Sequence, residues 1–118
     1  DYTIYHTPRC SKSRQTLALL EQKGIAPNII LYLKTPPNAA ALKQCLKALG
    51  INPRELLRTK EEAYKNLNLA NPRLSDEALI QAMSNNPKLI ERPIVLKQTA
   101  QQTLAVLGRP PENVLTLL

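Results

Sequence analysis

Hydrophobic and polar positions in the first third of the chain predict a strand, a helix and a second strand in succession. Residues 2–6 alternate and are rich in Tyr, Thr and Ile, which is typical of a strand, and Pro8 ends it. Residues 11–23 have the composition of a helix, and Gly24 is well suited to follow its last turn. Residues 28–33 are apolar and β-prone. This order implies two parallel strands joined by a right-handed crossover.

The next segment predicts an amphipathic helix. Apolar residues recur at helical spacing from Leu42 to Leu49, so they form one stripe along the helix surface. Asn38 precedes the stripe as an N-cap, and Gly50 stops the helix after it. Cys45 lies on the stripe, and we therefore expect it in the core rather than in a redox role.

Three shorter helical segments are predicted after this helix. Residues 53–57 form a helical turn that opens with proline at a tolerated first position. Residues 59–66 form a second segment, opened by Thr59 with a glutamate three residues later, which is a capping-box pattern. Ser75 is a strong N-cap for a helix over 76–85, whose first two residues are acidic.

The C-terminal part returns to strands. Residues 88–90 and 93–96 predict two short strands, whereas the pattern over 98–107 favours no element. Two prolines at positions 110 and 111 open a final helix that reaches Leu118. The whole order is strand, helix, strand, a helical insertion, two strands and a closing helix. It predicts one α/β domain of residues 1–118.

Composition and cysteine usage restrict the class of protein. With 118 residues, of which 43% are hydrophobic and 21% charged, the chain can bury a core without disulfides or metals. No apolar run approaches the roughly 18 residues of a membrane span, and the start has no signal-peptide pattern. Two cysteines are too few for a disulfide framework. We therefore expect a cytoplasmic protein with no membrane contact.

The charge balance favours anionic partners. The chain carries a formal net charge of +7, from 16 Lys and Arg against 9 Asp and Glu. Such an excess suits phosphate-like oxyanions, nucleic acids or acidic surfaces. The basic residues are scattered, form no tail and are not interleaved with aromatics. Charge alone does not decide between a binding face and a solvated surface, and our expectation for the partners includes no nucleic acid.

Cys10 occupies the most informative position, because it lies where the first predicted strand ends and the first helix begins. The N–H groups and partial positive charge of a helix N-terminus stabilise a thiolate and lower its pKa. Arg9, Lys12 and Arg14 add cations around it. The same loop can also bind an oxyanion. The pattern therefore predicts a reactive thiolate, whereas the alternative is a small buried cysteine that happens to lie in a loop.

Ser13 stands where a thioredoxin-like Cys-x-x-Cys motif would place its second cysteine. Without that partner, Cys10 cannot close a local disulfide. A redox reaction at Cys10 therefore needs a thiol from outside the chain.

The segment around Cys10 resembles the opening motif of a known family. Residues 4–17, IYHTPRCSKSRQTL, contain His-x-Pro-x-Cys followed at fixed spacing by Ser-Arg. Further blocks continue the match in order: IILYL at 29–33, LLR at 56–58, LIERPIV at 89–95 and GRP at 108–110. Over essentially the whole chain, the sequence is similar to glutaredoxin-dependent arsenate reductases of the ArsC type, and in particular to a chromosomal branch of that family.

This resemblance implies a fold and a set of roles. The implied fold is a thioredoxin-like (glutaredoxin-like) α/β fold, a mixed sheet flanked by helices with a helical insertion. Cys10 would be the nucleophile toward arsenate, and Pro93 the cis-proline beside it. Three further residues would surround and tune the thiolate: His6, Ser13 and Arg14. Three arginines would hold arsenate and its reduced product: Arg58, Arg92 and Arg109.

The resemblance also implies the reaction partners. Glutathione would be the co-substrate and glutaredoxin the source of reducing equivalents, with no bound cofactor and no metal. Guanidinium groups suit this chemistry, because they match the geometry of an oxyanion and offset its charge as a thiolate approaches.

Other interpretations stay open at this stage. Taken alone, His6 is a half-buried strand residue, and each of the arginines is a surface charge. A second function class is a regulator of the Spx type, which shares this fold and binds RNA polymerase, although such regulators carry the Cys-x-x-Cys switch that Ser13 removes here. A third is a glutathione-dependent thiol oxidoreductase that does not act on arsenate, which would need Cys10 but not three arginines.

Overall fold

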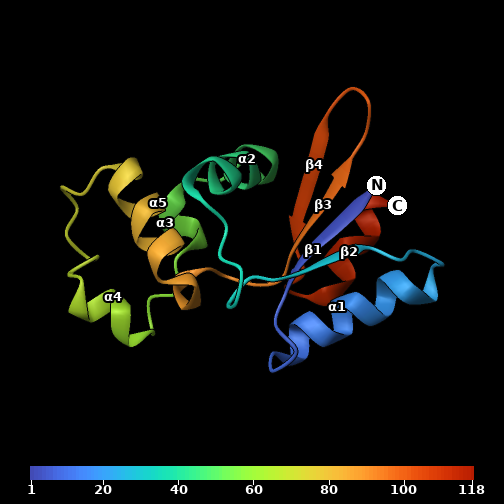
Figure 1. Cartoon of the computed structure of the whole chain (residues 1–118), viewed down its shortest axis with the longest axis horizontal. Coiled ribbons are helices and arrows are strands. Elements are labelled where there is room, and N and C mark those ends of the chain that lie inside the picture. The colour runs from blue at the N-terminus through green and yellow to red at the C-terminus, as the bar shows by residue number, and fades with distance from the viewer. The chain divides into compact units, whose positions relative to one another are not determined.

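The computed structural model describes all 118 residues and divides the chain into two compact units (Figure 1). The first, here called the sheet unit, comprises Asp1–Thr35 and Arg92–Leu118. The second, the helical unit, is Pro36–Glu91. The helical unit interrupts the sheet unit in sequence, which confirms the predicted helical insertion.

The sheet unit contains one four-stranded sheet in the order β2-β1-β3-β4. Its strands are β1 (Tyr2–His6), β2 (Asn28–Leu31), β3 (Ile94–Gln98) and β4 (Thr103–Leu107). β1 pairs in parallel with β2, as the strand–helix–strand pattern predicts, and antiparallel with β3. β3 and β4 form an antiparallel pair. The sheet is therefore mixed, and β2 and β4 are its edge strands.

Two helices cover the core of this sheet. These are α1 (Ser11–Gln22) and the 3₁₀ helix η2 (Pro111–Leu117), which pack against each other. The buried cluster combines residues of the sheet and both helices: Ile4, Leu20, Val95, Val114 and Leu117. Since only aliphatic side chains occupy this cluster, its stability depends on close packing of branched side chains.

The helical unit contains four α-helices and one 3₁₀ helix. They are α2 (Ala39–Leu49), α3 (Pro53–Leu56), α4 (Glu62–Asn66), α5 (Asp76–Asn85) and η1 (Pro87–Leu89). Two predicted caps are confirmed. The Asn38 side chain accepts a hydrogen bond from Ala41 N at 2.8 Å, and Ser75 Oγ accepts one from Ala78 N at 3.1 Å. Cys45 is buried in α2, as its place on the apolar stripe predicts.

The structure corrects several element predictions. β2 ends at Leu31 instead of residue 33, because the Leu31 carbonyl accepts hydrogen bonds from Lys34 N and Thr35 N and turns the chain. The strand predicted over 88–90 is wrong: Pro87 opens a 3₁₀ turn, and only Ile90 makes an isolated bridge.

Two further corrections concern short helices. The capping box predicted at Thr59 is wrong, because α4 begins at Glu62 and Glu61 is its N-cap. The hydrogen bond from Glu61 N to Arg58 O closes a turn that places Thr59 before the helix. The capping box lies instead at α3, where Asn52 and Glu55 bond reciprocally. The closing helix is 3₁₀ instead of α, and β4 occupies the segment with no predicted type.

Candidate active site

Cys10 is the N-cap residue of α1 and follows directly from the turn after β1. Its backbone is extended, with φ −93° and ψ 122°. Cys10 N donates to Thr7 O at 3.1 Å, which closes the turn, and Cys10 O accepts from Arg14 N at 3.0 Å, which begins the helix. The side chain is partly exposed. The thiol therefore lies at the helix N-terminus, where the sequence placed it, and remains accessible.

The surroundings of Cys10 favour its thiolate. Partial burial raises the pKa of the thiol, but hydrogen bonds from the backbone N–H groups of Ser13 and Lys12 lower it. A hydrogen bond from the Arg92 side chain and the charge of Arg92 lower it further. The net effect is a Cys10 pKa below its ordinary value. A larger fraction of this cysteine is therefore nucleophilic near neutral pH.

Arg92 and Arg109 converge on the same sulfur. Arg109 Nη1 lies 3.9 Å from Cys10 Sγ and donates to Arg92 O at 3.1 Å. Two peptide bonds in this region are cis: Arg92–Pro93, which the resemblance implies, and Arg109–Pro110, which the sequence did not single out. The structure thus brings a thiol and two guanidinium groups together from distant parts of the sheet unit.

His6 and Ser13 form a buried pair beneath the loop that carries Cys10. His6 Nδ1 lies 2.6 Å from Ser13 Oγ, and this hydroxyl also accepts a hydrogen bond from Thr7 N at 3.2 Å. Ser13 and His6 are 0% and 6% exposed. The pair ties the end of β1 to the first turn of α1, so it supports the position of Cys10 through the backbone of this loop.

The pKa of His6 is lowered by burial and by the charge of Arg14, although Glu21 opposes this shift. The folded protein therefore binds a proton at His6 less readily than the unfolded chain. The stability that this provides is fully present above the unfolded pKa, about 6.5, and is lost as the pH falls toward the folded pKa. His6 is the only histidine of the chain, so no second histidine contributes to the change in stability over this pH range.

We expect the free energy of unfolding to fall more steeply between pH 7 and pH 5 in the wild type than in His6→Asn. Asparagine keeps a polar atom near the Nδ1 position but does not titrate. The difference in slope should not exceed about 1.4 kcal/mol per pH unit, the limit for one proton. Urea unfolding at several pH values measures both slopes, and equal slopes would contradict the prediction.

The Arg14 side chain binds the loop before Cys10. Its Nη1 donates to Pro8 O at 2.7 Å, so it clamps the loop between β1 and α1. A cation in the first turn of a helix is disfavoured by the helix dipole. The hydrogen bond from Arg14 to Pro8 O offsets this unfavourable interaction with the helix dipole.

Arg58 belongs to the helical unit. It lies between two carboxylates: its Nη1 is 2.9 Å from Glu91 Oε1, and its Nε is 3.4 Å from Glu61 Oε2. Sequence reasoning did not single out either glutamate. Glu61 lies three residues after Arg58, and opposite charges often pair at this spacing. This spacing was the one sequence signal for the Arg58–Glu61 ion pair.

Gly108 also belongs to the site, although the sequence analysis named it only as part of the GRP block at 108–110. Its N donates to Pro93 O at 2.9 Å, next to the Arg92 and Arg109 segments. A Cβ atom on Gly108 would clash with the Thr16 side chain and would lie 2.8 Å from Pro93 Cγ. Only glycine lets the segment before Arg109 approach Pro93 and α1 this closely.

We expect Gly108→Ala to destabilise the protein by about 1–3 kcal/mol, because the added methyl group overpacks a closed contact. Thr16→Ala in the same chain removes the Thr16 atoms that the methyl group would meet and leaves its contact with Pro93 Cγ. The double variant should therefore be more stable than the sum of the two single effects predicts. Urea unfolding of the four proteins tests this, and strict additivity would rule out the clash with Thr16 as the cause.

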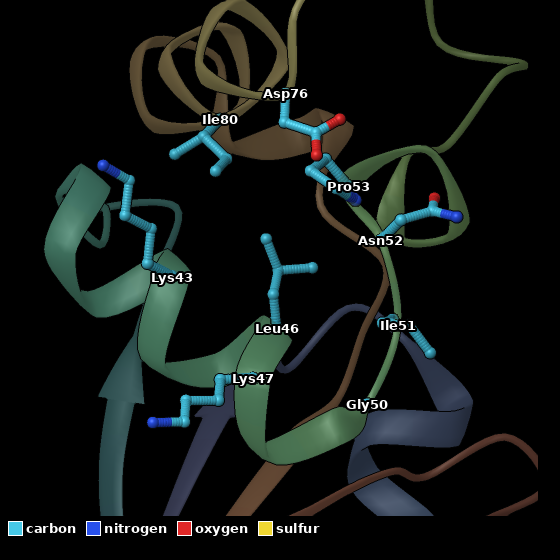
Figure 2. A pocket seen from close by; sticks show the side chains of 9 residues that line it. All are labelled: Lys43, Leu46, Lys47, Gly50, Ile51, Asn52, Pro53, Asp76 and Ile80. Carbon is cyan, nitrogen blue, oxygen red and sulfur yellow. The ribbon is translucent and has the colours of Figure 1, made fainter.

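Each unit contains a pocket. In the helical unit, a pocket of about 460 Å³ is bounded by α2 and α5, and Figure 2 shows Leu46 pointing into it. Lys43 at its rim pairs with Glu77 at 2.8 Å, and no cysteine lines it. In the sheet unit, a pocket of about 360 Å³ is lined by residues 6–9 of the loop before Cys10 and by the end of β2. Only the second pocket adjoins the reactive thiol in sequence.

The structure contains no group of three or more His, Cys, Asp or Glu side chains that could hold a metal ion. Its helices are also too short and too polar to cross a bilayer.

Comparison with known proteins identifies the family. The model of the ArsC family matches residues 5–117. The chain is 58% identical over 116 residues to the uncharacterized protein YfgD of Escherichia coli K12, covering 98% of this chain and 94% of that protein. It is 52% identical over 116 residues to an arsenate reductase of Haemophilus influenzae, covering 98% of this chain and 97% of that protein.

A solved structure supports the same assignment. The arsenate reductase from Vibrio cholerae superposes with a TM-score of 0.92 at 54% identity, covering 99% of this chain and 97% of that chain. The predicted thioredoxin-like class, a mixed sheet flanked by helices, is thereby confirmed. The family match, which spans nearly the whole chain, and the high identity to these relatives show that this chain belongs to the ArsC family.

Proposed function

We propose that this protein reduces arsenate to arsenite, with Cys10 as the nucleophile and glutathione and glutaredoxin as the source of electrons. The convergence of Arg92 and Arg109 on the Cys10 thiol, with Arg109 Nη1 at 3.9 Å from Sγ, is the observation that carries the proposal. The names of the Haemophilus and Vibrio relatives support the choice of arsenate as substrate.

The first step is attack of the Cys10 thiolate on arsenic. An arsenic–sulfur bond forms, an arsenic–oxygen bond breaks, and the oxygen leaves as water after taking up protons. Thiolate and arsenate are both negatively charged, so their approach needs cations. Arg92 and Arg109 supply this charge as preorganised donors, and the N–H groups of Lys12 and Ser13 add to it.

Reduction follows at the bound arsenic. A glutathione thiolate displaces a second oxygen as water, so arsenic(V) then carries two sulfur atoms. A glutaredoxin thiolate attacks the glutathione sulfur, a mixed disulfide forms, and the electron pair of that arsenic–sulfur bond stays on arsenic. Arsenic(III) leaves Cys10 on hydrolysis. The two electrons that arsenic gains are those that two thiols lose on forming one disulfide.

The remaining site residues take supporting roles in this proposal. Arg58 would help to hold arsenate or arsenite through the guanidinium donors that its pairs with Glu61 and Glu91 do not use. His6, Ser13 and Arg14 would act as positioning residues through the loop that carries Cys10. Because the reaction depends on a reduced thiol and on glutathione, we propose that the protein works in the cytoplasm.

The test is a coupled assay of the purified protein. Arsenate, glutathione, glutaredoxin, glutathione reductase and NADPH are combined, and NADPH oxidation is followed. We expect oxidation that needs both arsenate and glutaredoxin, with arsenite as the product. The absence of arsenate-dependent oxidation, in a preparation whose Cys10 is readily alkylated near neutral pH, would overturn the arsenate assignment and favour a thiol oxidoreductase or a regulatory protein.

A further inference from the structure

The pocket beside the Cys10 loop combines cationic and apolar groups. Residues 6–9 form one wall, and Leu31, Leu33 and Lys34 form the other. Leu31 is paired with His6 in the register of β1 and β2, so both walls lie at the carboxyl ends of these two parallel strands. Ligands of open α/β sheets bind at this end of the strands.

The cations of this pocket are available to a ligand. Arg9 and Lys34 are exposed, and neither belongs to the ion pairs that Lys43 and Arg58 form. The apolar part of the wall is also open, because Leu31 and Leu33 are each 37% exposed. Two separated cations with an apolar surface beside them suit a small molecule that has two carboxylates joined by a carbon chain.

The pocket is also within reach of the reacting sulfur. The hydrogen bond from Cys10 N to Thr7 O closes a four-residue turn, and such turns keep their first and fourth Cα atoms within about 7 Å. Thr7 lines the pocket. An extended tripeptide spans about 10 Å, so one bound here can place a thiol at Cys10 while its ends stay in the pocket.

We propose that this pocket of the sheet unit binds glutathione, with its carboxylates paired to Arg9 and Lys34 and its thiol directed to Cys10. The assignment rests on the proposed function for the identity of the thiol. Arsenate itself would occupy the separate position between Cys10 Sγ and the guanidinium groups of Arg92 and Arg109. A volume of about 360 Å³ exceeds what a tetrahedral oxyanion needs and falls in the usual range for small-molecule pockets.

A reaction without arsenate tests this subsite. The Cys10 thiolate attacks glutathione disulfide, its sulfur joins one glutathione as a mixed disulfide, and the other glutathione leaves as a thiolate. The rate constant is compared with that for hydroxyethyl disulfide, which carries no charge. The ratio of the two rate constants reports recognition of glutathione, because any change in the reactivity of Cys10 itself affects both reactions.

The variants are Arg9→Gln, Lys34→Gln and the double substitution, with Lys23→Gln as the matched control. Lys23 is an exposed cation at the end of α1 and does not line the pocket. We expect the ratio to fall about threefold for each single variant and about tenfold for the double variant, as contacts of partly exposed charges allow. Lys23→Gln should leave it unchanged.

An unchanged ratio in the double variant would overturn the subsite, even if the protein reduces arsenate. A reduced ratio in a protein that does not turn over arsenate would keep the subsite and overturn the proposed function instead. Where arsenate is reduced, the double variant should also raise the KM for glutathione and leave the KM for arsenate unchanged. The reverse pattern would show that the two cations serve arsenate.

Discussion

Cys10→Ser is expected to reduce the turnover of arsenate by at least about 10³-fold, below what the assay detects, because removing the nucleophile of a covalent mechanism costs this much or more. A serine hydroxyl ionises far above neutral pH, so the N–H groups and arginines that stabilise the Cys10 thiolate cannot make it a nucleophile. The coupled NADPH assay measures the loss directly.

The matched control is Cys45→Ala, which removes the other cysteine of the chain. Cys45 is 1% exposed and lies in the core of the helical unit, so we expect turnover to remain. Cys10 is partly exposed, and its replacement should leave the thermal unfolding of the protein unchanged. Loss of activity in both cysteine variants, or residual activity in Cys10→Ser, would contradict a mechanism with one nucleophilic cysteine.

Arg92→Gln is expected to have the second largest effect on arsenate reduction, because it changes both the pKa of Cys10 and the binding of arsenate. The Arg92 side chain both donates a hydrogen bond to Cys10 and lowers its pKa by charge. Glutamine removes the charge, so the pKa of Cys10 rises and the thiolate fraction near neutral pH falls. The same change removes a donor to arsenate in the transition state. Together these should lower kcat/KM for arsenate by about 10²-fold or more.

Two measurements separate these consequences. The rate of alkylation of Cys10 by iodoacetamide follows the thiolate, and its midpoint should move to higher pH in Arg92→Gln. Assay of arsenate reduction well above that midpoint restores the thiolate and leaves only the loss of the donor. Arg73→Gln is the control, since Arg73 is an exposed arginine of the helical unit. An unmoved alkylation midpoint in Arg92→Gln would show that Arg92 does not stabilise the thiolate.

Local signals were sufficient for much of the secondary structure. The N-caps Asn38 and Ser75 and the stop at Gly50 determine α2 and α5 through contacts within a few residues, and these boundaries were predicted correctly. The prediction failed where two local signals compete. Thr59 has the pattern of a cap, but the turn closed by Glu61 N and Arg58 O moves the helix start.

The sequence by itself also determined the position of the nucleophile. A strand, a short turn and a helix follow one another within a few residues around Cys10, so its place at the N-terminus of α1 requires no long-range contact. The donors from Lys12 and Ser13 come with that place, because they belong to the first turn of the same helix. These are local properties of the chain, and they were predicted.

Only the tertiary structure decided what surrounds the thiol. Arg109 reaches Cys10 across 99 positions in sequence, and it does so because β3 and β4 pair antiparallel and return the chain to Pro93. The close approach at Gly108 and the pairing of Arg58 with Glu91 also join segments far apart along the chain. Such contacts depend on strand order, register and packing among segments far apart along the chain, and no local pattern of residues encodes them.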